Sequence, residues 1–492
     1  MFRKSAFAAL LLLATSSSLA LAAATAEEAL KIKANLQTYL GTEAGVVSVA
    51  PEGDDYLITI DIAPYLKKGE ASGLKASITP FKFKARPQGE GLWQVNSSGP
   101  MDMKFSVAGA VSSTMRVAAF DWKGIFDESL GGLIEQNYTM NGMTLTQSME
   151  DAQTKIKNDV AYGIESIVGS NKSTNLGNGI ADAQGALTFT GITTATKNQF
   201  PPEMVAQGMP NLDYTATLAK GSYTSTSKGV RVKALMDLLA WLVAHPEKEM
   251  IVKDQAQLIA KISAALPLFE NISTSGKAEN IAFATSVGQF TLASLGSVVD
   301  FNGVVADGKL REGFSIAGIT IPPGIAPPWA AELVPRNFNL DFALSDFNLE
   351  APAKMILGQL DLSKEPPIPA GAEVLLLPAF VPRNAMKINF TAGEVSSALY
   401  ALTYDGEVTA NFAGLPTAKA TFKMKGLDAV LAIVQAAAAT DPMAQQAVPG
   451  LIAAKGLGKA EADGTLTWIV EFDGANKVTV NGLDVGNMGA GQ

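Results

Sequence analysis

The chain has 492 residues, of which 47% are hydrophobic and 17% charged, with a formal net charge of −9 at pH 7. This length predicts about two to four domains, and the negative charge without a basic cluster beyond the N-terminus argues against nucleic acid or anionic lipid as a partner. Because there is no cysteine, disulfides, thiolate metal sites and a lipid-attachment box are excluded.

Residues 1–26 are typical of a secretory signal peptide. Arg3 and Lys4 precede an apolar run over residues 6–13, and small residues follow at alternate positions. Two cleavage frames fit, after Ala22 or after Ala26, and charged Glu27 slightly favours Ala26. The alternative is an uncleaved anchor, but the apolar run is shorter than the roughly 20 residues that a spanning helix needs. We therefore expect an exported protein whose mature chain has no integral membrane span.

A helix is expected over residues 27–40, because its apolar residues follow helical spacing and Gly41 can end it. From Val46 the period changes to two, with runs over residues 56–62, 74–85, 91–95 and 103–107 separated by turn residues. Such alternation predicts an antiparallel meander with one buried face. Residues 152–168 fit either a helix or a strand, and the flanking strands favour a strand.

Two helical hairpins are predicted, at residues 233–266 and 427–455. The first is broken at His245-Pro246 and the second at Asp441-Pro442, since proline is excluded from a helix interior. A strand precedes each hairpin and alternating segments follow it, with an offset of 192 positions that pairs Lys233 with Lys425. We interpret this as an internal duplication, with looser copies of the strand-to-helix joint at Gly124 and Asp346.

The predicted fold class is α+β, mainly antiparallel β, with long curved sheets, inserted helical hairpins and an internal duplication. Proline is densest at residues 321–328 and 365–369, which favours extended backbone outside central strands. The first of these segments places a domain boundary near residue 325. This divides the chain into a β-rich part at 27–325, a second at 326–485 and a disordered tail at 486–492.

No catalytic, cofactor-binding or metal-binding residue is predicted. The single histidine, His245, excludes paired-histidine metal motifs and is expected to cap a helix end or lie at the surface. Ser72 and Lys75 have the Ser-x-x-Lys spacing of penicillin-recognising enzymes, but no Lys-Thr-Gly segment accompanies them. Residues 453–460 lack the residues of a phosphate loop and predict a helix end, while the acidic residues at 52–55 predict a solvated turn.

Several short segments together resemble an exported bacterial family called domain of unknown function 2125. These segments are residues 56–64, 78–83, 329–335, 347–349, 425–429 and 480–482, together with the signal peptide. The resemblance covers most of the mature chain and implies a Gram-negative periplasmic protein. It transfers no site residues, because no activity is established for the family.

The leading prediction is a non-enzymatic binding or envelope-maintenance protein that shelters an apolar ligand, such as a lipid, between curved sheets. Many amphipathic strands, low charge and the lack of a catalytic motif favour it, although a protein that only packs its own core has the same features. One alternative is a carboxylate-dependent hydrolase acting on envelope glycans. Another is a structural partner of outer-membrane assemblies. The oligomeric state cannot be predicted.

Overall fold

A computed structural model describes residues 23–485, apart from residues 69, 71, 72, 108, 109, 152, 209–211 and 476. The predicted signal peptide therefore lies outside the described residues up to residue 22, as does the predicted tail at 486–492. The described chain is mostly antiparallel β, which confirms the coarser part of the predicted fold class.

The described chain forms two compact units. The first holds the chain up to Ile272 together with residues 283–286 and 357–368, and the second holds residues 273–282, 287–356 and the remainder from Pro369. The boundary predicted near residue 325 falls within the second unit, in the proline-rich segment between strands β13 (Gly308–Ala317) and β14 (Asn337–Phe347).

The first unit contains ten strands and six helices in its described residues. The strands are β1 (Val47–Glu52), β2 (Asp55–Ile60), β3 (Leu74–Ile78), β4 (Phe81–Gly89), β5 (Leu92–Val107), β6 (Val111–Asp127), β7 (Gly132–Glu150), β8 (Lys157–Gly177), β9 (Ile180–Gln199) and β10 (Leu212–Val230). The helices are α1 (Ala26–Leu40), α2 (Ala63–Lys67), α3 (Pro202–Ala206), α4 (Val232–Ala244), α5 (Lys248–Lys253) and α6 (Gln255–Ala265).

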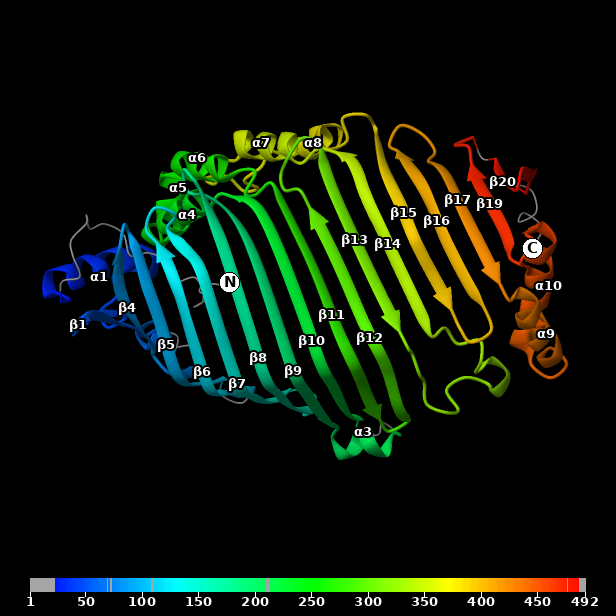
Figure 1. Ribbon diagram of the computed structural model, residues 1–492, viewed down its shortest axis with the longest axis horizontal. Helices are drawn as coiled ribbons and strands as arrows, with labels where there is room; N and C mark the ends of the chain where they lie inside the picture. The colour runs from blue at the N-terminus through cyan, green and yellow to red at the C-terminus, as the bar shows by residue number, and fades with distance from the viewer. Residues whose placement is uncertain are drawn as a thin grey trace. The chain divides into compact units, whose positions relative to one another are not determined.

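The strands of the first unit pair antiparallel in the order β1-β2-β4-β5-β6-β7-β8-β9-β10, with β3 beside the far end of β5 (Figure 1). Strands from β4 onward are neighbours in both sequence and sheet, with α3 in the connection between β9 and β10, so this is the meander that the sequence predicts. Because directly paired residues share a face, the register assigns every side chain to one of two faces.

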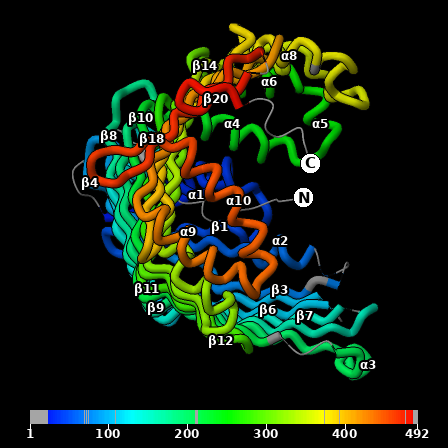
Figure 2. Tube along the Cα trace, turned by 90° about the vertical axis from the view of Figure 1, so that its right-hand side faces the viewer, coloured from blue at the N-terminus to red at the C-terminus, as the bar shows by residue number. Residues whose placement is uncertain are grey.

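The core of the first unit lies under helices α1 and α4, which contact each other and lie on the same side of the strands (Figure 2). From α1, Ala29, Ile32 and Leu36 pack on apolar residues of β1, β2, β4, β5 and β6, with Met236 of α4 beside them. Ile58 at the centre is 0% exposed. The predicted helix at 27–40 is confirmed, ending at Gly41 with φ 83°.

In the second unit, the nineteen residues 318–336 form a proline-rich segment between β13 and β14. Its described elements are β12 (Gly288–Phe301), β13, the short helix η3 (Pro328–Ala330), β14, α8 (Ala372–Phe380), β15 (Ala385–Ser396), β16 (Ala401–Asn411), β17 (Thr417–Lys425), α9 (Leu427–Ala437), α10 (Pro442–Leu457), β18 (Lys459–Ala460), β19 (Leu466–Phe472), β20 (Val478–Val480) and β21 (Leu483–Asp484). Strand β11 (Asn271–Thr285) and helix α7 (Glu350–Gln359) are divided between the two units.

Strands of the second unit pair antiparallel in the order β12-β13-β14-β15-β16-β17-β19-β20-β21, and β18 also pairs with β19. Val430 and Val434 of α9 pack with Ala444 of α10, and Trp329 and Tyr400 border this cluster. The Trp329 indole donates to the Asp441 carboxylate at 2.9 Å, and Asp441 also accepts from the first amides of α10, which confirms the predicted break there.

Other sequence predictions have mixed outcomes. Residues 157–168 lie in β8, so the choice of strand over helix was right. Gly124 was predicted to end a strand before a helix, but it lies inside β6, because the strand continues through Asp127 and turns into β7. The region predicted as a helical hairpin at 233–266 contains three helices, α4, α5 and α6. Helix α5 lies between Pro246 and α6, where no helix was expected. Helix α8 was missed.

The aligned joints of the predicted duplication differ in structure. Lys425 is the last residue of β17 and Gly426, at φ 89°, precedes α9, whereas the aligned Lys233 already lies in the first turn of α4. The two joints are therefore offset by about one helical turn relative to the sequence alignment. The internal duplication stays a prediction.

Candidate functional site

One face of strands β7 to β10 in the first unit is apolar over several strands. We call this the apolar strip and define it by Leu145, Tyr162, Ile167, Leu187, Phe189, Ile192, Leu218 and Tyr223. The register places them together, because Leu145 pairs with Tyr162, Ile167 with Phe189, Ile192 with Leu218, and Leu187 with Tyr223.

The side chains of the apolar strip are neither buried nor fully exposed. Seven of them are half-buried and Tyr223 is 41% exposed. The packed core reaches β7 through Tyr138, Met140 and Met143, and α4 contacts β9. On the same face, Ile164 of β8 and Thr196 of β9 are buried, with exposed fractions of 9% and 2%.

Aromatic rings lie flat along this face over glycines of the next strand. A Cβ added at Gly169 would lie 2.2 Å from Tyr138, and one added at Gly221 would lie 2.0 Å from the Phe189 ring. Each glycine is directly paired with the strand that carries the ring, so it leaves the space that the ring fills. The arrangement makes the face low and continuous instead of ridged. Burial also raises the pKa of the Tyr138 phenol.

Polar side chains bound the apolar strip at both ends. At one end the Asn158 amide donates to the Asn198 carbonyl across β8 and β9. At the other, Asn171 donates to the Ser173 hydroxyl at 3.3 Å. Between Val160 and Gly169 the strip spans about 30 Å along the strands and about 14 Å across four strands. These dimensions suit an elongated apolar group with a polar terminus.

The opposite face of the same strands is hydroxyl-rich. Positions adjacent to those of the strip carry Thr144, Thr146, Ser166, Ser170, Thr188, Thr190, Thr193, Thr217 and Thr224. Val168 is an exception, an apolar side chain that is 49% exposed on this polar face. One face of these strands is therefore apolar and the other polar. A sheet solvated on both faces would not need this alternation of apolar and polar residues, so the strip is a distinct surface.

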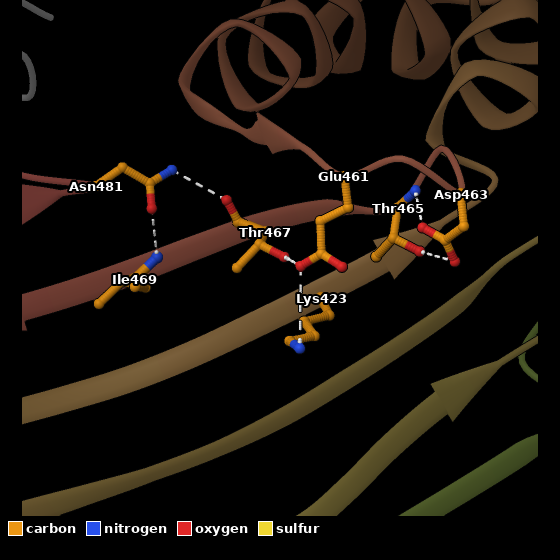
Figure 3. A network of polar contacts seen from close by, with 7 residues as sticks. All are labelled: Lys423, Glu461, Asp463, Thr465, Thr467, Ile469 and Asn481. Atoms are coloured by element: carbon orange, nitrogen blue, oxygen red, sulfur yellow. Dashed lines mark hydrogen bonds and ion pairs between the residues drawn. The ribbon is translucent and has the colours of Figure 1, made fainter.

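Carboxylates beside β19 in the second unit are paired within a local network (Figure 3). Glu461 accepts from the Thr467 hydroxyl at 2.5 Å and lies 3.9 Å from the Lys423 ammonium, while Asp463 accepts from both the amide and the hydroxyl of Thr465. Asn481 bridges β19 through the Ile469 amide and the Thr467 carbonyl. These groups join β17, β18 and β19, which is a structural role.

His245 connects two helices of the first unit. Its ring stacks on Trp241 with centroids 3.9 Å apart, its Nδ1 lies 2.7 Å from the Trp241 carbonyl, and its Nε2 lies 3.3 Å from the Asp254 carboxylate. Asp254 precedes α6 and His245 ends α4, so the contacts fix the angle at which the chain returns. This confirms the predicted position at a helix end.

The remaining motifs lie in ordinary structural positions. Glu52 and Asp55 flank the β1–β2 turn and form ion pairs with Lys84 at 3.2 Å and Arg86 at 2.6 Å. Residues 453–460 cover the end of α10 and β18. Lys75 lies in β3, whereas Ser72 is outside the described residues, so their relative placement is not defined.

The described residues contain no cluster of three or more histidine, aspartate or glutamate side chains arranged to hold a metal ion. None of the described helices combines the length and apolarity of a membrane span.

Comparison with known proteins assigns no family. No family model and no curated protein matches the chain. A search of solved structures returned the alcaligin outer membrane receptor FauA from Bordetella pertussis at 8% identity and a TM-score of 0.18, covering 87% of this chain and 66% of the receptor. A score this low carries no inference about fold or function.

Proposed function

We propose that the protein binds an elongated apolar ligand, such as the acyl chain of a lipid, on the apolar strip of β7 to β10. The observation that carries this proposal is that the eight apolar side chains of the strip keep partial exposure on one face while the reverse face is polar. Exposed apolar surfaces of a few hundred Å² on soluble proteins commonly mark binding sites. No step of covalent chemistry is part of the proposal.

Burial of a ligand on the strip would be driven by the hydrophobic effect, at about 25 cal/mol for each Å² of apolar surface removed from water. The flat rings of Tyr138 and Phe189 offer a smooth surface without a shaped pocket. Such a surface discriminates poorly between chain lengths, because one methylene changes the binding free energy by only about 0.8 kcal/mol. The polar ends at Asn158 and Asn171 favour an amphiphile over a pure hydrocarbon.

A matched pair of variants tests the site. Ile167 and Val168 are neighbours in β8, on the apolar strip and on the reverse face respectively. Binding of a fluorescent fatty acid to the purified protein should weaken at least about tenfold in Ile167→Asn, a loss of roughly 1.4 kcal/mol, and stay unchanged in Val168→Asn. Equal binding by both variants, with circular dichroism showing both folded, would exclude the strip as the site.

We further propose export to the periplasm with cleavage after Ala22. The Ala24 amide donates to the Gly53 carbonyl at 3.0 Å, the Thr25 amide donates to the Tyr56 hydroxyl at 3.1 Å, and the Thr25 hydroxyl caps α1 by accepting from Glu28. Cleavage after Ala26 would remove all three contacts, including the helix cap, whose loss typically costs about 1 kcal/mol. These contacts favour the earlier frame over the one that the charge of Glu27 suggested.

Membership of the domain of unknown function 2125 family, and a role in maintaining the envelope, are likewise proposals. They rest on the short segments that the sequence shares with that family, and the binding test above is independent of them. Intact-mass analysis of protein recovered from the periplasm tests export and the cleavage frame together: a chain beginning at Ala23 supports both.

A further inference from the structure

A second surface of the first unit has the chemistry of an anion site. A depression of about 630 Å³ lies over β3, β5 and β6, and its walls include Glu70, Lys75, Ser77, Lys104, Ser106, Ser112 and Thr114. Its volume lies within the range of about 300–1,000 Å³ that is usual for small-molecule sites. The depression is separate from the apolar strip, which begins on the neighbouring strand β7 and lies on the opposite face of the sheet.

The strand register explains why the two lysines face the same space. Lys75 pairs with Ser106, which pairs with Ser112, and Ser77 pairs with Lys104, which pairs with Thr114. All six residues therefore share the polar face of the sheet in two adjacent rows. Lys75 and Lys104 are diagonal neighbours across β3 and β5, with Cβ atoms about 7–8 Å apart or less. Long flexible stems allow both ammonium groups to reach one ligand.

Among the described residues, neither lysine has a carboxylate within ion-pair distance. By contrast, the nearby Arg116 of β6 lies 3.9 Å from the Asp102 carboxylate. Glu70 is the acidic residue in the wall of the depression. The two ammonium groups repel each other, and an anion between them would relieve that repulsion. An anion with several oxygen atoms would also accept hydrogen bonds from the surrounding hydroxyl groups.

We propose that this depression binds a phosphate group, held by Lys75 and Lys104 and oriented by the hydroxyls of Ser77, Ser106, Ser112 and Thr114. The phosphate can belong to a free phosphate ester or to the headgroup of a lipid, since both present the same tetrahedral oxygens. The proposal does not depend on the apolar strip, and either site can bind without the other.

Titration of the purified protein with glycerol phosphate at low ionic strength, followed by calorimetry, tests the site. We expect saturable binding that Lys75→Ala and Lys104→Ala each weaken about tenfold, because each removes a charge-assisted hydrogen bond. Lys220→Ala is the matched control, since Lys220 of β10 is an exposed lysine on the same polar face of the sheet but outside the depression. Glu70→Gln should tighten binding by removing the repelling carboxylate, and added salt should weaken it.

A vesicle assay separates the two sources of phosphate. Binding to phosphatidylglycerol vesicles but not to phosphatidylcholine vesicles, with loss in both lysine variants, assigns a lipid headgroup, while binding of glycerol phosphate alone assigns a free ester. The proposal is overturned if neither probe binds, or if Lys75→Ala and Lys104→Ala bind as tightly as Lys220→Ala.

Discussion

The strands of the first unit differ along the sheet in what lies above the same face. Under α1 and α4, Ile58 and Phe126 are 0% and 1% exposed, whereas Ile167 and Leu187, on the same face of β8 and β9, are half-buried. Both regions alternate apolar and polar residues. The alternation therefore determines which face is apolar, and packing with α1 and α4 accounts for the complete burial of Ile58 and Phe126.

Truncation of a large side chain should show the largest difference between the two regions. Phe126→Ala leaves a cavity under the helices and should lower the free energy of unfolding by about 3–5 kcal/mol. Leu187→Ala should cost about 1 kcal/mol, because its side chain already contacts solvent. Urea denaturation of both variants measures the contrast, and equal losses would mean that Leu187 lies in a closed core.

Asp127, beside Phe126 in the covered region, should make folding pH-dependent in acid. Burial acts to raise the pKa of its carboxyl, but hydrogen bonds from Ser129, Asn175 and the Leu130 amide outweigh burial, so the pKa lies below its usual 3.8. The carboxylate therefore stabilises the fold above about pH 4, and this stability is lost as the pH falls through the lowered pKa.

Asp127→Asn should lower the free energy of unfolding at pH 7 by about 2 kcal/mol, since charge-assisted hydrogen bonds become neutral ones. It should also flatten the dependence of stability on pH below 4. Denaturation curves at pH 3 and pH 7 for both proteins measure this. An unchanged pH dependence in the variant would show that other carboxylates dominate acid unfolding.

Gly169→Ala should change the apolar strip more than the stability of the protein. The new Cβ would occupy the position of the Tyr138 ring, which must turn away from the sheet. We expect a loss of about 1 kcal/mol in stability together with weaker binding of a fluorescent fatty acid. The control variant is Ala186→Gly on the reverse face of β9. Gly177→Ala is less suitable, because Gly177 has φ 86° and an alanine would be strained there. Normal binding by Gly169→Ala would show that a ligand does not pass over Tyr138.

The smallest expected effect is a gain. The Thr196 hydroxyl, in a residue that is 2% exposed, has no hydrogen-bond partner among the described residues. Thr196→Val removes that buried polar group at nearly constant shape and should raise the free energy of unfolding by about 1 kcal/mol. A loss of stability on thermal denaturation would show that the hydroxyl is hydrogen-bonded in solution.

Sequence periodicity predicted the secondary structure well where neighbouring residues in the chain determine it. The helix from Ala26 and the breaks before Pro246 and Pro442 follow from spacing and proline geometry. Helix α8 was missed, because Ala372–Phe380 is apolar apart from Glu373 and contains Pro378, so it lacks amphipathic spacing. Gly124 was misassigned because the sequence alone does not distinguish a glycine inside a long strand from a glycine that ends a strand.

The candidate site could be predicted only in part. Alternation identified strands with one apolar face, but a period of two does not tell whether a helix covers that face. Cover depends on contacts between distant residues, such as Leu36 of α1 with the strands that follow it. Likewise Lys75 and Lys104 are 29 positions apart in sequence, and only the pairing of β3 with β5 places them in one depression.

Native mass spectrometry of the protein purified from the periplasm, combined with lipid extraction, tests ligand binding on the apolar strip most directly. We predict a bound amphiphile that is retained in Val168→Asn and lost in Ile167→Asn, with both variants folded. Recovery of the protein without any bound amphiphile, together with the same spectrum for both variants, would contradict it.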